Sequence, residues 1–336
     1  MGRVAVLLTG ALVVHQLTVH AQAGERRIAV LPMEASRVEW LVGGEESELF
    51  SNPGRFALLD SLVVVADARE PAITALDVRT GRVVWRQARE GSGPGELRQP
   101  SFAAWHPRGV VIADNGTRRL LLYSTAGALL EETPVPGGLF VVGVCGLADG
   151  RVVIAHPPAG EFVSMVVELG STRSRPLPDP LPTARLSLTE RHVELTTVRT
   201  GGEATGCIAV RTVSDGVAYF GPDQPAITGS YIERRVQRKL IPPMQIRDTS
   251  QLPIQFAAGA SVWRDRVVVQ SGRSPGCRGV CLDLYDLRTL RYRQTIQLRG
   301  SLGVQVRSLA VGDGFMIVLG TRDGFPVVLR YPLQLP

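Results

Sequence analysis

A tight turn between two apolar segments recurs six times along this chain of 336 residues, and it constrains the fold more than any other feature. The turn is built on Asp-Gly or a close variant, and a segment rich in Val, Ile or Leu follows it, as in Asp149–Ile154. The turns fall near positions 60, 108, 149, 215, 265 and 313, so the gaps are 48, 41, 66, 50 and 48 residues. Gly and Asp tolerate the positive φ that a two-residue hairpin needs. The pattern therefore predicts six β-hairpins at nearly even spacing.

A second and more polar strand–turn–strand pair follows several of these hairpins. Examples are Ile73–Arg86, Arg119–Glu131 and Cys281–Ile296. Each repeat therefore holds four strands, and four-stranded units repeated around an axis form a β-propeller, whereas a sandwich requires no such even spacing. We expect an all-β protein, namely a six-bladed β-propeller of four-stranded antiparallel blades. A strand near Ile28–Pro32 or Val38–Val42 is expected to complete the last blade.

The longest gap between turns predicts extra chain in the middle of the molecule. Residues 24–336 are expected to form one propeller domain with an insertion near Ser171–Gly206. Within it, Leu181–Val198 is the one segment whose pattern is compatible with a long amphipathic helix.

The first 23 residues have the pattern of a secretory signal peptide. Arg3 supplies a basic end, Val4–Val14 is mostly apolar, and Ala21-Gln22-Ala23 fits the small-x-small cleavage rule. The apolar run is too short to span a bilayer, and a buried N-terminal strand or helix is the alternative. No Cys stands near the cleavage site, so a lipid anchor is not expected. We predict a periplasmic or secreted protein without a membrane span.

Four cysteines remain after this leader, an even number that suits an oxidising compartment. The spacing of Cys277 and Cys281 predicts a disulfide that closes a small loop. A second disulfide is predicted between Cys145 and Cys207. A zinc site would need further ligands, and few His residues follow the leader.

The charge of the chain does not indicate a nucleic-acid partner. The formal net charge is +6, aromatic residues make up 6% of the chain, and Lys239 is the only Lys among the basic residues. The longest basic stretch, Arg234–Lys239, reads as a solvated strand face. We expect a monomer that binds no nucleic acid.

Several segments resemble known propeller repeats. Val111–Gly127 resembles an NHL-type repeat, Gly91–Leu97 with the following Pro100 resembles a loop of bacterial secreted six-bladed β-propellers, and Val318–Tyr331 is similar to their last blade. The resemblance to this NHL-repeat-like or TolB-like family implies the fold but little chemistry. A competing resemblance is carried by Ala75–Trp85, which is similar to a repeat of quinoprotein-like propellers with more blades.

The resemblance to propellers also indicates where a ligand would bind. Ligands usually meet the face that carries the loops between second and third strands and the loops between blades. We expect the former loops at Asp67–Pro71, Asp114–Arg118, His156–Glu161, Pro222–Thr228, Ser271–Val280 and Thr321–Phe325. The candidate ligand-binding residues are Arg69, Asp114, Asn115, Arg118, Arg273, Arg322 and Asp323. Arginines converging on one mouth would favour an anionic ligand, and the alternative is solvated loop charges in local ion pairs.

Two loops allow both a functional and a structural interpretation. Asp114 and Asn115 are candidates for a Ca²⁺ site, or for an Asx-turn that caps the loop. The glycine-rich segment Glu90–Pro100 either exposes backbone N–H groups to a ligand or forms a plain turn between blades.

No catalytic motif stands out in the sequence, and no cofactor or catalytic residue is predicted. The expected tops of the inner strands are largely Val, Ile, Ala and Gly, which favours binding over catalysis. We therefore expect an extracytoplasmic binding or scaffold propeller that recognises a protein, peptide or glycan. The alternative is a metal-dependent hydrolase or lactonase-like enzyme that uses the central channel, for which Asp114 is the one metal ligand we can nominate.

Overall fold

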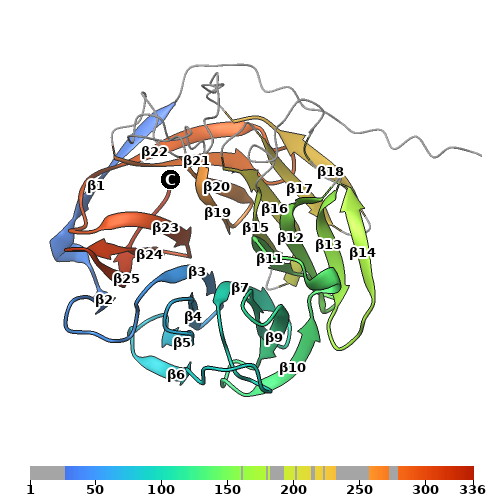
Figure 1. The fold of residues 1–336 in the computed structure, drawn as a ribbon. Coiled ribbons are helices and arrows are strands. Elements are labelled where there is room, and N and C mark those ends of the chain that lie inside the picture. The colour runs from blue at the N-terminus through green and yellow to red at the C-terminus, as the bar shows by residue number, and fades with distance from the viewer. Residues whose placement is uncertain are drawn as a thin grey trace, which may run out of the picture.

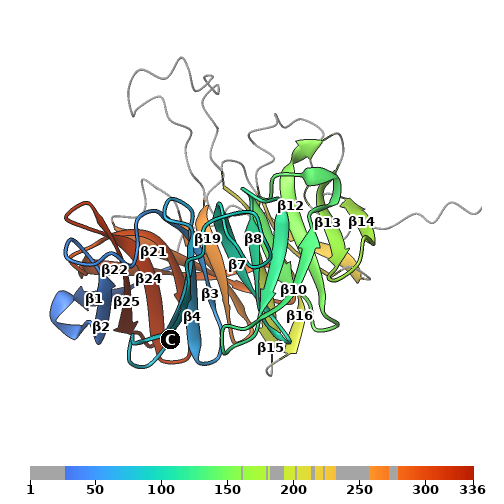
Figure 2. The ribbon, with the colours of Figure 1, turned by 60° about the horizontal axis from the view of Figure 1, so that its bottom comes forward.

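The described strands form six sheets arranged radially around an axis, as Figure 1 shows. The structure is a computed structural model that describes residues 27–159, 162–178, 181, 193–200, 203–212, 216–221, 224–231, 257–271 and 279–336. Figure 2, turned from the first view, shows the sheets standing side by side. The predicted six-bladed β-propeller is confirmed.

Blades one to four each take four consecutive strands, with the first strand innermost and all neighbours antiparallel. Blade one holds β3 (Pro53–Leu58), β4 (Leu62–Asp67), β5 (Ala72–Asp77) and β6 (Val83–Gln87). Blade two holds β7 (Pro100–His106), β8 (Gly109–Asp114), β9 (Arg119–Tyr123) and β10 (Leu129–Pro134). Blade three holds β11 (Gly143–Gly146), β12 (Arg151–Ala159), β13 (Phe162–Glu168) and β14 (Ser174–Pro178). Blade four holds β15 (Val193–Thr200), β16 (Glu203–Arg211), β17 (Val217–Gly221) and β18 (Gln224–Gly229).

The last two blades each recruit a strand from the N-terminal part of the chain. Blade five holds β19 (Ala257–Trp263), β20 (Arg266–Ser271), β21 (Val280–Asp286), β22 (Tyr292–Ser301) and, parallel to β22, β1 (Ile28–Glu34). Blade six holds β23 (Gln305–Val311), β24 (Phe315–Arg322), β25 (Phe325–Pro332) and β2 (Trp40–Gly43). Two short 3₁₀ helices, η1 (Ala35–Arg37) and η2 (Pro136–Gly138), lie in connections.

Ring closure follows from the pairing of β2. This strand runs antiparallel to β25, with Trp40 opposite Arg330, and so completes blade six. The prediction that an N-terminal strand completes the last blade is confirmed for the candidate Val38–Val42, which overlaps β2. The other candidate, Ile28–Pro32, instead lies in β1 and adds a fifth strand to blade five.

The second strand is the most buried strand of blades one and two, and this explains its composition. Every residue of β4 and of β8 is buried. A neighbouring sheet covers each face of such a strand, so apolar residues occupy consecutive positions rather than alternate ones. The core is therefore divided among the interfaces between blades; for example, Val64 of blade one and Ile112 of blade two belong to the same apolar cluster.

Tryptophans of two outer strands dock onto the next blade. The ring of Trp85 on β6 lies against Gly127 in blade two, where an added Cβ would be 2.7 Å from the ring. The ring of Trp40 on β2 lies in the same way against Gly81 in blade one, at 2.8 Å. Each indole N–H donates to a backbone carbonyl of the turn that it contacts. The repeat at Ala75–Trp85 thus joins blades through an aromatic ring and a glycine.

A disulfide joins blades three and four. Cys145 on β11 and Cys207 on β16 are bonded and fully buried, with their Cα atoms 6.0 Å apart. This predicted pairing is confirmed. Cys281 is also disulfide-bonded. Its predicted partner, Cys277, lies outside the described residues.

The fourth repeat differs from the prediction by one hairpin. The Asp-Gly turn near position 215 joins β16 to β17, the second and third strands of blade four, and not the first and second. The predicted second-to-third loop at Pro222–Thr228 is likewise wrong, because it follows β17, the third strand, and most of it lies in β18. The error has a physical cause, since Asp-Gly serves any tight hairpin whatever its place in the blade.

This shift in phase changes the interpretation of the middle of the chain. The stretch Ser171–Gly206, predicted to hold an insertion, contains β14 and β15, which are regular blade strands. The possible helix at Leu181–Val198 is wrong from Val193 onward, where the chain forms β15. Residues 182–192 lie outside the described residues.

Candidate functional site

Two kinds of loop share one end of the propeller, which we call the loop face. Each innermost strand begins there, so the connections that enter the blades lie at this end. Because successive strands alternate in direction, the loops between second and third strands lie there as well. Among the described loops, those at Asp67–Pro71, Asp114–Arg118 and Thr321–Phe325 connect second to third strands as predicted.

Asp114 ends the second strand of blade two and fastens the loop that enters its own blade. The residue is 1% exposed. It accepts hydrogen bonds from the backbone N–H groups of Arg98 (2.8 Å), Gln99 (2.8 Å), Gly116 (2.9 Å) and Thr117 (3.2 Å). Asp67, at the equivalent position in blade one, accepts from the backbone of Ser51, Asn52 and Arg69. These carboxylates bind backbone amides of the protein itself.

Asn115 fastens the loop that enters the next blade. Its side-chain N–H donates to the carbonyl of Val141 (2.9 Å), and its side-chain oxygen accepts from the N–H of Val141 (2.8 Å). Both residues are buried. The adjacent side chains of Asp114 and Asn115 thus hold the loops on either side of blade two. The hydrogen bonds that Asp114 accepts from Gly116 and Thr117 form an Asx-turn.

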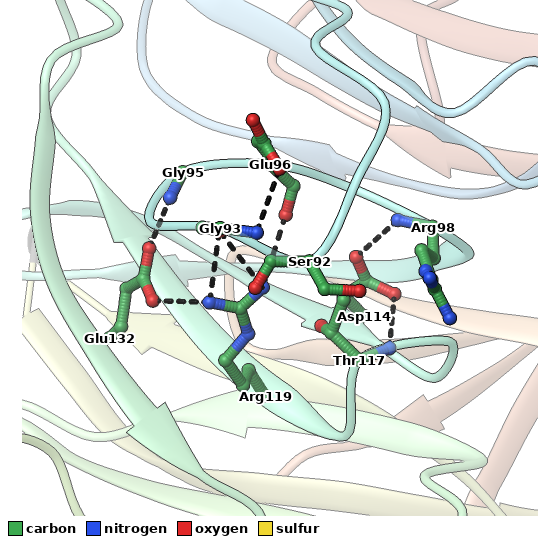
Figure 3. Close-up of polar contacts among 9 residues, drawn as sticks. All are labelled: Ser92, Gly93, Gly95, Glu96, Arg98, Asp114, Thr117, Arg119 and Glu132. Carbon is green, nitrogen blue, oxygen red and sulfur yellow. Dashed lines mark hydrogen bonds and ion pairs between the residues drawn. The ribbon is translucent and has the colours of Figure 1, made fainter.

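The glycine-rich loop wraps around Arg119, as Figure 3 shows. The guanidinium of Arg119 donates to the carbonyls of Ser92 (3.1 Å) and Gly93 (3.1 and 3.2 Å) and forms an ion pair with Glu132 (2.6 Å). Glu132 also accepts from the N–H of Gly95, and Glu96 accepts from the N–H of Gly93 (2.7 Å). The N–H groups of both glycines are therefore used within the protein.

The exposed arginines of the loop face have local neighbours. The guanidinium of Arg118 lies 5.1 Å from the ring centre of Phe140, and Arg118 adopts a positive φ of 56°. Arg322 lies 3.9 Å from the carboxylate of Asp323. Arg69 is exposed. Of these side chains, the structure brings together Arg118 with Phe140 and Arg322 with Asp323.

An axial cavity of about 170 Å³ lies among the innermost strands of the six blades. Its lining includes none of the candidate residues predicted from the sequence, and one of them, Arg273, lies outside the described residues. The charged residues of its described lining are Arg55 of β3 and Glu194 of β15. They form an ion pair, and Arg55 also donates to the carbonyl of Ala258 (3.2 Å).

This ion pair crosses the axis close to the loop face. Blades one and four lie opposite each other in the ring, and both residues stand near the start of an innermost strand. Burial raises the pKa of Glu194, and the positive charge of Arg55 acts against that rise. Sequence reasoning missed the pair, although a charge near the start of each strand was the available signal.

A second ion pair crosses the axis at the opposite end. Arg199, near the end of β15, lies 2.8 Å from Asp60, in the turn after β3. The guanidinium of Arg199 also lies 4.9 Å from the ring centre of Trp105. Blades one and four are thus joined across the axis at both ends of the cavity.

The described residues contain neither a cluster of metal-ligating side chains nor a membrane-spanning helix. That part of the chain holds no group of three or more His, Cys, Asp or Glu side chains arranged to bind a metal ion. Within the same residues, no helix is long and apolar enough to cross a bilayer.

The fold and its loop face define a six-bladed β-propeller, and the comparisons with known proteins show which proteins it resembles. The family model described as outer membrane protein assembly factor BamB matches residues 8–155, less than half of the chain. This match covers Ala75–Trp85, the segment with the quinoprotein-like pattern. No curated protein matches the chain.

Solved structures share the fold at low sequence identity. A putative exported protein from Bacteroides fragilis has a TM-score of 0.55 and 12% identity, over 91% of this chain and 100% of its own. A member of a domain family of unknown function from Bacteroides vulgatus has a TM-score of 0.57 and 9% identity, over 89% and 98%. A streptogramin B lyase has a TM-score of 0.50 and 12% identity, over 88% and 99%. The resemblance to bacterial exported six-bladed propellers is confirmed at the level of the fold, while the likeness to NHL repeats stays a prediction.

Proposed function

We propose that this protein is a non-enzymatic binding propeller that acts outside the cytoplasm and recognises a protein partner through its loop face. The observation that carries the proposal is that two exposed phenylalanines on that face each lie next to an exposed arginine. Phe140 and Phe325 are each 39% exposed. Phe140 lies under Arg118, and Phe325 pairs with Arg322 at the end of the β24–β25 hairpin. Aromatic and Arg side chains are enriched at protein interfaces and supply much of their binding energy.

The polar groups beneath this surface support binding rather than catalysis. Asp114 and Asn115 use their side-chain oxygens on backbone amides, and the charges of the cavity lining pair with each other. A peptide and a glycan are the other ligands that the sequence led us to expect. A protein is favoured because the family model that matches residues 8–155 describes an assembly factor.

The disulfides support a location outside the cytoplasm. Cys145 and Cys207 are bonded in the protein core, and such bonds persist in oxidising compartments. Export would follow from the signal peptide predicted at residues 1–23, with cleavage after Ala23. The mass of the purified secreted chain tests this step directly.

The test of binding compares variants of two surfaces. Phe140→Ser with Phe325→Ser changes the loop face, and Val83→Ser with Val84→Ser changes exposed residues of the outer strand β6 as a matched control. Crosslinking in the native compartment, followed by mass spectrometry, should identify a partner that the first variant loses and the second keeps. Equal crosslinking by both variants would contradict the proposal, as would stoichiometric metal in the purified protein together with a melting temperature that a chelator lowers.

A further inference from the structure

The axial cavity combines one balanced pair of charges with an otherwise uncharged lining. Arg55 and Glu194 are the only charged or titratable side chains that the described parts of the innermost strands contribute to it. The rest of the lining is apolar, hydroxyl-bearing or glycine, together with the backbone. Any charged molecule that enters must therefore interact with this pair.

A buried hydroxyl in the lining lacks a partner. Ser308 of β23 is 6% exposed, and its oxygen makes no hydrogen bond with the residues that the structure describes. The lining hydroxyls of Thr196 and Ser261 are used, because Thr196 donates to the carbonyl of Ala260 (2.9 Å) and Ser261 accepts from a backbone N–H (3.3 Å). An unpartnered buried hydroxyl is unfavourable, and a carboxylate oxygen bonded to Ser308 would remove that cost.

Arg55 has donors to spare for such a ligand. A guanidinium carries five N–H groups. The bonds to Glu194 and to the carbonyl of Ala258 occupy one N–H on each terminal nitrogen of Arg55. Gly259 has no side chain to fill the space beside the ion pair, since an added Cβ there would lie 3.6 Å from Glu194 and 3.9 Å from Arg55.

We propose that the axial cavity binds a small monocarboxylate, with its carboxylate on Arg55 and within reach of the Ser308 hydroxyl. The ligand takes the place of Glu194 on Arg55, and Glu194 takes up one proton from solvent. No covalent bond forms or breaks, and the net charge of the site is conserved because one anion and one proton enter together. This site goes beyond the proposed function and does not rest on it.

The environment of Glu194 favours this exchange. Burial raises its pKa, and Arg55 is the only charged group in the described lining that opposes the rise. When the ligand occupies Arg55, the pKa of Glu194 rises further, so the carboxyl group binds a proton. The affinity for the carboxylate is therefore expected to increase as the pH falls, until the ligand itself is protonated.

Calorimetric titration with acetate tests the proposal, with acetamide as the neutral control of the same shape. Acetate should bind the full-length protein, acetamide should not, and buffers of different ionisation enthalpy should report the uptake of about one proton. Glu194→Gln removes the competing charge, so it should bind acetate about tenfold more tightly, without the pH dependence. Arg55→Gln should abolish binding, and Ser308→Ala should weaken it.

A matched control is Arg264→Gln, which removes an exposed ion pair with Asp313 outside the cavity and should leave acetate binding unchanged. Glu194→Gln conserves shape, so it remains informative if Arg55→Gln fails to fold. The proposal is overturned if acetate binds neither the natural protein nor Glu194→Gln, if acetamide binds as well as acetate, or if Glu194→Gln binds no more tightly. Loss of the crosslinked partner in the loop-face variant bears only on the proposed function.

Discussion

Replacement of Asp114 by Asn distinguishes a structural carboxylate from a metal ligand. Asp114 Oδ1 accepts from Gln99, Gly116 and Thr117, and Oδ2 accepts from Arg98. Asn keeps one acceptor oxygen in the position of Oδ1. Its amide nitrogen then occupies the position of Oδ2 and faces the N–H of Arg98, so two donors meet where a hydrogen bond stood.

The size of the effect follows from that geometry. Loss of a hydrogen bond to a charged group costs about 1.5–3 kcal/mol, and a donor left unsatisfied adds about 1 kcal/mol. We expect Asp114→Asn to lower the free energy of unfolding by about 3 kcal/mol, because the loop that enters blade two loses part of its attachment. Urea unfolding followed by tryptophan fluorescence measures this change.

The unfolding experiment on Asp114→Asn needs a control variant and a measurement with and without calcium. Asp323→Asn makes the same substitution at a side chain that is 86% exposed. Its effect on the free energy of unfolding should therefore stay within about 0.5 kcal/mol. The loss at Asp114 should be the same with calcium and with a chelator. A stability equal to that of the natural protein, or a loss seen only when calcium is present, would refute the structural role.

Three further perturbations probe other parts of the propeller. Cys145→Ser with Cys207→Ser removes a crosslink over a sequence separation of 62 residues, so the free energy of unfolding should fall by about 4 kcal/mol in denaturant titrations. Gly127→Ala places a Cβ 2.7 Å from the ring of Trp85 at a φ of +83°, which should cost about 2–4 kcal/mol and shift the tryptophan emission. Asp286 has a pKa lowered from 3.8 to about 2, chiefly by its hydrogen bond with Arg293. Because the folded pKa is the lower one, the stability that Asp286 adds is present above pH 4 and lost as the pH falls toward 2. The difference between natural protein and Asp286→Asn in melting temperature should therefore shrink over that interval.

Controls for these variants lie at open positions. Gly324→Ala has a φ of +89° but no atom within 4 Å of its Cβ, so it reports backbone strain without the clash at Gly127. Asp313→Asn removes an exposed carboxylate and is the matched control for the loss of a charge at Asp286. Equal costs at Gly127 and Gly324 would refute the docking role of the tryptophan.

Turn chemistry made the number of blades predictable from the sequence. It did not show, for every blade, which two strands the turn connects. Five of the six predicted turns join first and second strands, as expected from their spacing. The Asp-Gly near position 215 joins second and third strands, because turn residues report a tight hairpin and carry no information on its place in the sheet. The pairing of Cys145 with Cys207 was predictable, since the other two cysteines lie close together in sequence.

The candidate site was less predictable than the fold. Loop position correctly placed Arg118 and Arg322 at the loop face, yet Asp114 and Asn115 bind backbone amides in the interior. The pattern of a polar residue at the end of an apolar strand is the same whether its side chain meets solvent or a loop. Phe140 and Phe325 were not singled out, because burial decides whether an aromatic residue belongs to a core or to a surface.

The order of residues along the chain determines the strands, their hairpins and the six-fold repetition, because hydrophobic pattern and turn chemistry act over short stretches of sequence. Only the closed ring decides that Arg55 meets Glu194, 139 residues away, and that Asp60 meets Arg199 across the same axis. Such partners come from opposite blades, and their distance depends on how many sheets close the ring and at what radius. Short stretches of sequence do not determine that radius, so only the tertiary structure decides the cavity and which charged residues meet in it.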